Sequence, residues 1–485
     1  MRIDRLVPCM LLVFVGCGSE QKFVQVDAKL DGPAGDGPED PDGPTPDGPA
    51  DGPAGDVVNL TNLTPIAGRV LRADFVTPLF FKPDGTAVAV TANYLGTVDN
   101  FEPIVVPLDG SGLIRTVNLD ACGICDADHF AWTADGASLY AVGDLGTDGK
   151  TDVFKLDPTM ANQTPVLAAD ATTGGTGGDI NTVFAVDAGG GVSRIWAVGD
   201  WLTDGARVAG GFASDATLPF NTATPPTFVV PGGGRELFDG TGSTVNVFDA
   251  RGTKVAFVSD ITQNNRFDLY IANADGSSPV LLVTGQTNVE ITSVSISPDG
   301  TKVGYIMDST ANNNGFDLHV VPAAGGVSTQ LSPLRVAQAT TQDVFFQFEW
   351  SADSKFIAFS ADLETDGVDS GYVVDTTQAV PVAVVILPAA DIGTQTSGAQ
   401  GTRGKLLFDS ANNIYFRART VTGDDNFKLF KSTPTGTKVT IDLPPRTDAT
   451  TPDVGAFGIS PDGTKLVFSS DSPTVDTYNL FLQAL

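Results

Sequence analysis

The chain has 485 residues, with 58 acidic against 28 basic side chains and a formal net charge of −30 at pH 7. Such a charge repels phosphate backbones, and no Lys/Arg cluster is visible, so nucleic-acid binding is not expected, whereas cations and basic partners are compatible with it. The 54 Gly residues and the scarcity of aromatic residues other than Phe indicate a turn-rich, all-β protein.

The first 17 residues predict an export signal. Arg2 and Arg5 supply a positive start, and the apolar run at 6–16 is too short to span a bilayer. Residues 14–17 (FVGC) resemble a bacterial lipobox with Phe14 in place of the usual Leu, so we expect cleavage before Cys17 and acylation of this residue. The protein would then be lipid-anchored in the cell envelope, at the outer membrane. An ordinary secretory signal is the alternative.

Residues 18–56 predict a disordered tether. Between residues 27 and 56 there are five Asp-Gly-Pro triplets and nine acidic residues, with Lys29 as the one basic residue. Prolines and a lack of large apolar side chains prevent such a segment from forming a packed core. We expect a spacer that holds a globular domain, residues 57–485, away from a membrane. An inert N-terminal segment is the alternative.

Residues 57–485 carry a repeat whose clearest copies are the Ser-Pro-Asp-Gly-Thr-Lys hexamers at 297–302 and 460–465. Each copy precedes an apolar strand that usually ends in an acidic residue. We call the residues at these strand ends the markers. Successive markers lie 48 to 60 residues apart, which is close to the length of a kelch-type propeller blade. The markers are Asn93, Asp144, Asp200, Asp260, Asp308, Asp362, Arg419 and Asp471.

Eight copies predict an eight-bladed β-propeller of four-stranded blades, with seven blades and one insertion as the alternative. In one unit the strands are expected at 291–297, 302–307, 316–321 and 327–331. Pro-Asp-Gly predicts the tight turn between the first two strands. Because the last unit ends after its third strand, residues 57–63 are expected to supply the fourth and close the ring. Degenerate turn copies are expected at 82–85, 133–136, 186–189, 249–252, 351–354 and 409–412.

The two hexamers, the second-strand run at 254–260 (KVAFVSD) and the third-strand run at 267–270 (FDLY) resemble the repeats of TolB-type, WD40-like β-propellers. The resemblance covers residues 57–485 and implies the propeller architecture. Repeats of this kind occur in periplasmic scaffold proteins, in the propellers of oligopeptidases and in some lyases. The resemblance therefore implies no single activity.

The acidic markers predict a binding face. In a four-stranded blade, the connection between strands two and three opens on the same face as the connection from strand four to the next blade. We expect the acidic markers to form a partial ring on this face. The alternative is that each side chain caps its own turn. The residues of this expected ring are Asp144, Asp200, Asp260, Asp308, Asp362 and Asp471.

Two hairpins after markers are similar to cation-binding loops, because carboxylates alternate in them around a Gly. Ca²⁺ takes six to eight oxygen ligands, and such loops can supply several of them. Neither loop has the Glu that an EF-hand places at its twelfth position. Calcium is the one cofactor that the sequence suggests. The candidate ligands are Asp144, Asp148 and Asp152 in one hairpin and Asp362, Asp366 and Asp369 in the other.

Cys122 and Cys125 form the only cysteine pair of the expected mature domain. In an exported protein a disulfide is expected. A metal site with help from Asp126, Asp128 or His129 and a redox function are the alternatives.

The sequence contains only two histidines, His129 and His319, and no Gly-x-Ser-x-Gly motif, so a Ser-His-Asp hydrolase is not expected. We expect a monomeric lipoprotein, anchored to the membrane by its acyl chains. Its propeller would be a non-catalytic binding platform for a protein or polysaccharide of the envelope. The alternative is a carbohydrate-active or lyase-type enzyme with a site in the central channel.

Overall fold

The computed structural model describes residues 57–61, 70–71, 79–93, 101–119, 125–145, 151–171, 179–188, 192–202, 207–216, 218–221, 225–231, 237, 247–263, 266–285, 290–308, 315–333, 342–393, 406–422, 426–448, 450–472 and 478–485. The predictions for Cys17, for the tether at 18–56, for Cys122 and for Asp148 lie outside these residues. Within them, no helix is long and apolar enough to cross a membrane. One short 3-10 helix, η2 (Ala389–Asp391), accompanies the strands.

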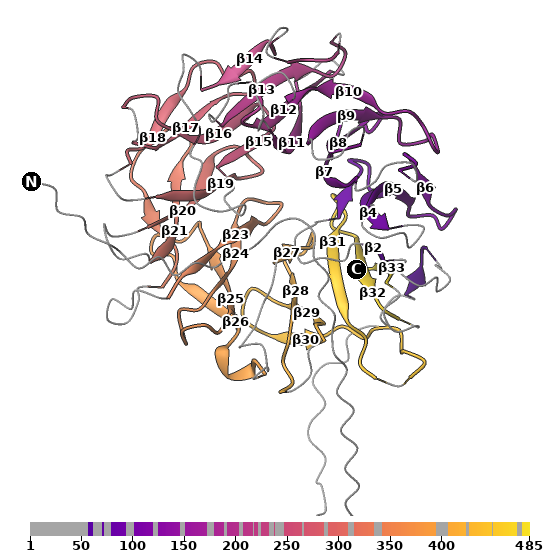
Figure 1. Cartoon of the computed structure of the whole chain (residues 1–485). Helices are drawn as coiled ribbons and strands as arrows, with labels where there is room; N and C mark the ends of the chain where they lie inside the picture. Colours follow the sequence, from indigo (N-terminus) through magenta and orange to yellow (C-terminus); the bar gives the residue numbers. More distant parts are fainter. Residues whose placement is uncertain are drawn as a thin grey trace, which may run out of the picture. The chain divides into compact units, whose positions relative to one another are not determined.

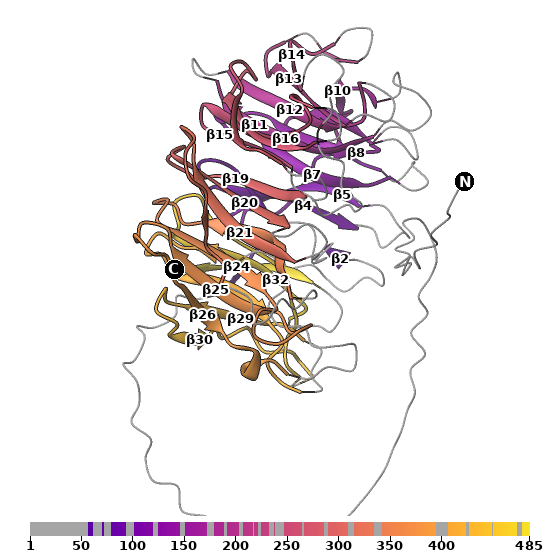
Figure 2. The same cartoon turned by 90° about the vertical axis from the view of Figure 1, so that its left-hand side faces the viewer.

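Eight antiparallel sheets follow one another along the chain, and Figure 1 shows them arranged around a ring. In blades 2, 3, 4, 6 and 7 the first strand is nearest the axis of the ring and the fourth is at its rim (Figure 1), and Figure 2 shows the sheets from the side. The expected all-β, eight-bladed propeller is confirmed. In blade 1 the innermost strand is in two pieces, β2 and β3, which both pair with β4.

The strands of blades 1 to 4 are β2 (Val70–Leu71), β3 (Phe80–Phe81), β4 (Ala87–Asn93), β5 (Glu102–Pro107) and β6 (Ile114–Arg115); β7 (Ala127–Trp132), β8 (Leu139–Gly143), β9 (Asp152–Leu156) and β10 (Val166–Ala169); β11 (Ile180–Asp187), β12 (Ser193–Gly199), β13 (Val208–Ala213) and β14 (Phe228–Val230); β15 (Phe248–Arg251), β16 (Lys254–Ser259), β17 (Asp268–Asn273) and β18 (Val280–Val283).

The strands of blades 5 to 8 are β19 (Ile291–Ile296), β20 (Lys302–Asp308), β21 (Phe316–Pro322) and β22 (Thr329–Gln330); β23 (Val344–Trp350), β24 (Phe356–Ala361), β25 (Ser370–Asp375) and β26 (Ala383–Leu387); β27 (Leu407–Phe408), β28 (Ile414–Ala418), β29 (Lys428–Ser432) and β30 (Lys438–Thr440); β31 (Val454–Ile459), β32 (Lys465–Ser470), β33 (Asn479–Ala484) and β1 (Val58–Asn59).

The repeated turn has the predicted chemistry. In blade 5 the Gly300 N–H donates to the Ser297 carbonyl over 2.8 Å, and Asp299 accepts from the Thr301 N–H at 3.0 Å. Gly300 has a φ of +69°, a conformation that Gly adopts without steric cost. Ser354 and Asn412 occupy the same position in blades 6 and 7 with φ of 62° and 64°. The turn geometry is therefore kept even where Gly is replaced.

Two turns differ from their predictions. In blade 3, Val186 and Asp187 of the turn expected at 186–189 lie inside β11, where they pair with Arg194 and Ser193 of β12. In blade 4, β15 continues to Arg251, which pairs with Lys254 at the start of β16, so that only Gly252 and Thr253 connect the two strands. Asp249, expected in the turn at 249–252, lies inside β15. The longer strand pairing replaces the hydrogen bonds that the Asp makes in the other turns.

The ring is closed by the segment that the sequence predicts. β1 pairs antiparallel with β33, with Val58 opposite Leu482, and the Leu60 N–H donates to the Leu480 carbonyl over 2.8 Å. Leu60 is 4% exposed and packs in a cluster that includes Val88 of blade 1 and Val467 of blade 8. Strand pairing and a shared core therefore join the last blade to the first.

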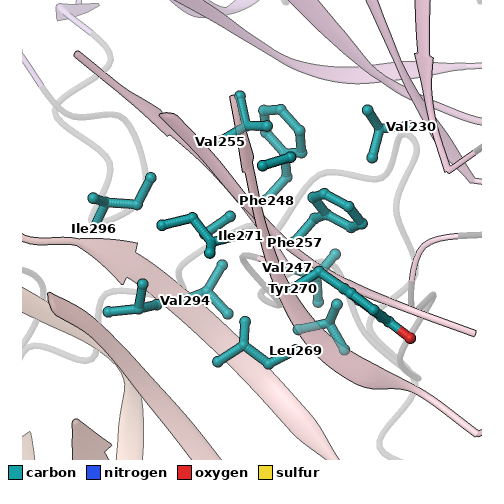
Figure 3. Packing of buried hydrophobic residues seen from close by; sticks show 14 of the residues in the cluster. Val230, Val247, Phe248, Val255, Phe257, Leu269, Tyr270, Ile271, Val294 and Ile296 are labelled. Atoms are coloured by element: carbon teal, nitrogen blue, oxygen red, sulfur yellow. The ribbon is translucent and has the colours of Figure 1, made fainter. Parts of the chain in front are cut away.

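The hydrophobic core lies between neighbouring blades. Figure 3 shows one cluster in which Phe248, Phe257 and Tyr270 of blade 4 pack with Val230 of blade 3 and Ile296 of blade 5. Each sheet thus buries both of its faces against adjacent sheets, as expected when repeats cannot form a core alone.

The turns between first and second strands are hydrogen-bonded from blade to blade. The Asp299 N–H of blade 5 donates to Ser354 Oγ of blade 6 over 2.9 Å, and Asn412 Nδ2 of blade 7 donates to Asp353 Oδ2 of blade 6 over 2.9 Å. Lys465 Nζ of blade 8 donates to the Gly85 carbonyl of blade 1 over 3.0 Å. The turns therefore link neighbouring blades as well as strands.

Turn carboxylates make stability depend on pH. Hydrogen bonds from Lys82 and Thr86 lower the pKa of Asp84 from 3.8 to about 2. A lowered folded-state pKa contributes stability that is present above the ordinary value and is lost as the pH falls through the folded value. We expect the urea midpoint of the wild-type chain to fall between about pH 4 and pH 2. The midpoint of Asp84→Asn should depend less on pH in this window, and parallel curves for the two chains would contradict the assignment.

Candidate functional site

The acidic markers hold the ends of the first two strands together. Asp200 Oδ1 accepts from the Asp179 N–H at 2.6 Å, and the Asp200 N–H donates to the Asp179 carbonyl over 3.1 Å. Asp471 and Asp453 form the same pair over 2.8 and 3.4 Å. Such reciprocal pairs satisfy backbone groups at a strand end. They are also formed by Asp144 with Asp126 and by Asp362 with Asp343.

The partner acids of the markers reach back to the preceding blade. Asp343 Oδ1 accepts from the N–H of Phe316 in blade 5 at 3.0 Å, and Asp453 Oδ1 accepts from the N–H of Phe427 near β29 in blade 7 at 2.7 Å. The first strands of blades 6 and 8 are therefore tied to the third strands of the blades before them. Sequence reasoning did not find these partners, because they lie in connections that vary in length.

Most of the expected acidic ring is not at the surface. Asp260, Asp308, Asp362 and Asp471 are buried, whereas Asp144 and Asp200 are half-buried. Arg446 Nη1 also donates to Asp471 Oδ2 over 2.8 Å. These contacts give the markers a structural part in the blades, and a ligand-binding role for this ring stays a prediction.

The candidate calcium loops are only partly described. Asp362 Oδ2 accepts from the Gly367 N–H at 3.0 Å within its own hairpin. Asp152 is buried and accepts from the Ala171 N–H at 2.7 Å. Among the residues that the structure describes, no group of three or more His, Cys, Asp and Glu side chains could hold a metal ion. Since Asp148 lies outside them, calcium binding stays a prediction.

The cysteine and histidine residues lie in separate surroundings. Cys125 is fully buried and disulfide-bonded, and its pairing with Cys122 stays a prediction. His319 of β21 stacks on Tyr305 with ring centroids 5.4 Å apart, and burial lowers the pKa of this imidazole below its usual value. His129 belongs to β7 in blade 2. The histidines thus belong to different blades and share no strand.

One register position of the innermost strands defines a ring of side chains around the axis. In each blade the residue at this position pairs with the residue four places before the marker, as Ser295 does with Gly304 and Glu349 with Ala358. We call the residues at this position the axial ring. They are Phe80, Ala131, Phe184, Asp249, Ser295, Glu349, Leu407 and Gly458.

One contact between blades that are not neighbours shows that Glu349 faces the axis. Arg251 Nη2 of blade 4 lies 3.9 Å from Glu349 Oε1 of blade 6. His129 of blade 2 lies between Phe80 of blade 1 and Phe184 of blade 3, with ring centroids 4.7 and 6.3 Å away. Arg251 and Glu349 can meet only on the axial side of blade 5, which lies between their blades.

The axial ring has two unlike halves. Blades 4 to 6 contribute the polar arc, Asp249, Ser295 and Glu349, and Asp249 Oδ2 accepts from the Ile296 N–H at 2.7 Å. The other five blades contribute the apolar arc, in which Phe80 and Phe184 are half-buried. Sequence reasoning missed the axial ring. It could have been found from the repeat, because the residue two places before the first residue of the turn occupies this position. In three of the copies this residue is Phe80, Ser295 or Glu349.

No protein-family model matches the chain, and no curated protein matches it. Among solved structures, the propeller of Dos1 is similar with a TM-score of 0.49 at 10% identity, covering 89% of this chain and 95% of its own. Oligogalacturonate lyase from Vibrio parahaemolyticus gives 0.46 at 10% identity, covering 89% and 98%. Prolyl oligopeptidase B from Galerina marginata gives 0.47 at 7% identity, covering 71% and 46%. The strand topology itself defines the class: an eight-bladed β-propeller.

Proposed function

We propose that the chain is a lipoprotein of the cell envelope whose propeller is a non-catalytic binding platform for an envelope protein or glycan. The observation that supports binding is the axial ring, in which a polar arc with two carboxylates faces an apolar arc with aromatic rings. Ligand sites commonly combine apolar walls with a few polar groups that orient the ligand. The anchor at Cys17 and the tether at 18–56 belong to the same proposal.

An enzyme is the second candidate function. Asp249 and Glu349 place two carboxylates in the same arc of the axial ring. Pairs of carboxylates carry out acid and base steps in most glycosidases. A carbohydrate-active or lyase-type enzyme would therefore also use this position of the fold.

The first test is a cross-linking pull-down of envelope extract on the full chain, with calcium and again with a chelator. A saturable partner is expected in calcium. Its loss on chelation would support the calcium loops at Asp144–Asp152 and Asp362–Asp369, and its retention would contradict them. No saturable partner under either condition would contradict the platform and favour the enzyme.

A further inference from the structure

We propose that β18 (Val280–Val283), the fourth strand of blade 4 at the rim of the ring (Figure 1), binds an extended segment of a partner protein as an added strand. The contact rests on the proposed function and specifies that the partner is a protein rather than a glycan. Two other blades show how such an edge is covered, because segments of this chain already lie along their fourth strands.

In blade 2 a segment of blade 3 covers the outer edge of β10. The Phe220 N–H donates to the Ala168 carbonyl over 2.9 Å, and the Asp170 N–H donates to the Phe220 carbonyl over 2.9 Å. Phe220 thereby lies parallel to β10, opposite Ala169, and its ring stacks on Phe212 of blade 3 with centroids 4.9 Å apart. We call residues 218–221 the covering segment.

The edge of blade 1 is covered in a similar way by blade 2. The Asn162 N–H donates to the Arg115 carbonyl at the end of β6, and the Gln163 N–H donates to the Thr116 carbonyl, both over 2.9 Å. In both cases the added residues belong to the connection between the third and fourth strands of the following blade. A long connection of this kind therefore satisfies backbone groups on the edge before it.

The edge of β18 has no such cover from the following blade. The connection between the third and fourth strands of blade 5 comprises only residues 323–328, whereas the one that carries the covering segment comprises residues 214–227. Thr284, directly after β18, is exposed, and within the residues that the structure describes its N–H has no hydrogen-bond partner. The backbone at the end of β18 can therefore accept another strand.

β18 has the same register in its blade as β10. Each strand has one bulged residue, Leu282 or Ala168, and the next residue pairs with the residue after a buried Asp of the third strand. In both blades this Asp, Asp268 or Asp152, accepts from a backbone N–H at 2.7 Å. The Leu282 carbonyl and the Thr284 N–H therefore correspond to the two groups that bind the covering segment in blade 2.

The surroundings of β18 suit an uncharged, apolar strand. No charged residue lies from position 276 to position 289, and Val280 and Leu281 are 47% and 40% exposed. Charged side chains usually protect an edge strand from pairing, and here they are missing. The covering segment of blade 2 is itself apolar at Leu218 and Phe220, which pack half-buried against the core. The expected segment therefore has a large apolar residue at the paired position.

A different protein fits this edge better than a second copy of the chain. Two copies with a net charge of −30 each repel one another. Strand addition draws its affinity from main-chain hydrogen bonds and its specificity from alternate side chains, and both are present at β18. A glycan has no regular series of N–H and carbonyl groups with which to continue the sheet.

The test removes the one N–H that the added strand would use. Thr284→Pro deletes this donor, and blade 6 already has Pro388 at the corresponding position, so the fold accommodates proline there. Thr284→Val is the matched control, because it keeps the N–H. The probe is a fluorescein-labelled peptide with the sequence of residues 216–222 (ATLPFNT), followed by anisotropy on the full chain. We expect its Kd to rise about fivefold or more in Thr284→Pro and less than about twofold in Thr284→Val.

A second measurement changes the peptide and leaves the protein as it is. Methylation of the backbone nitrogen of its Phe removes the donor for the Leu282 carbonyl, and binding to the wild-type chain should weaken about fivefold or more. This comparison decides the question even where Thr284→Pro does not reach the wild-type circular dichroism. Equal binding of the two peptides, or no binding of the unmodified one, would overturn the proposal.

Other outcomes separate the added strand from the binding platform. Equal Kd values in the two Thr284 variants would contradict the assignment to β18. Self-association of the wild-type chain in light scattering, lost in Thr284→Pro, would give the edge to a second copy instead of a partner. A pull-down partner that Thr284→Pro retains would leave the platform standing and sink the added strand, whereas the absence of any pull-down partner would contradict the platform itself.

Discussion

Replacing Gly199 by Ala is expected to destabilise the propeller by about 3 to 5 kcal/mol. A Cβ at this position would lie 2.0 Å from the Asp179 carbonyl oxygen and 2.8 Å from Ile180 Cα. Both contacts are with backbone, so no side-chain rotation relieves them. Separating the strands would also break the reciprocal pair of Asp200 and Asp179, with hydrogen bonds of 2.6 and 3.1 Å.

The matched control is Gly300→Ala. Gly300 has a φ of +69°, and a Cβ there would meet nothing within 4 Å, so only the backbone conformation is strained. This variant should lose about 1 kcal/mol. Urea unfolding followed by circular dichroism measures both variants. Equal losses would mean that backbone conformation, rather than the clash with Asp179, limits the substitution at Gly199.

Opening the ring should have an effect of similar size. In Leu60→Asp a carboxylate would enter the apolar cluster of blades 1 and 8, where Leu60 is 4% exposed. Loss of a buried Leu side chain costs about 2–5 kcal/mol, and burial of an unpaired charge adds to this. We expect a lower unfolding midpoint and association of the variant through the exposed edge of β33, measured by urea unfolding and light scattering.

Val58→Asp is the control for this prediction. Val58 belongs to the same strand but is 47% exposed, so the substitution should change stability by less than about 0.5 kcal/mol. If both substitutions are tolerated, the segment at 57–61 does not hold the ring closed. If both are equally harmful, strand pairing rather than burial of Leu60 carries the closure.

Local chemistry made much of the fold predictable from the sequence. Pro-Asp-Gly specifies a turn through one short carboxylate and one Gly, and the strands expected at 291–297 and 302–307 were found as β19 (Ile291–Ile296) and β20 (Lys302–Asp308). The closing strand was predictable because the last unit was one strand short. The turn at 249–252 was wrong, since its Pro-Asp-Gly signal is degraded and strand pairing extends to Arg251 instead.

Contacts between blades could not be predicted from the sequence. Arg251 and Glu349 are 98 positions apart, and only the curvature of the ring brings them within 3.9 Å. The acids that pair with the markers could not be predicted for a similar reason. They stand directly before the first strands, but the connections that precede these strands differ in length, so the repeat does not align them. With 58 acidic residues in the chain, composition alone could not single out Asp249 and Glu349 as members of the axial ring.

The contact between the N-terminal segment at 57–61 and β33 also determines when the ring can close during synthesis. Thr61 Oγ1 donates to Asn479 Oδ1 over 3.1 Å, and 418 positions separate the two residues. A ribosome that adds about 5–20 residues per second delivers the second partner roughly 20 to 80 s after the first. During that interval β1 has no β33 with which to pair. Ring closure is therefore one of the last events of biosynthesis, and an early stop in translation would leave an open arc with a bare edge at each end.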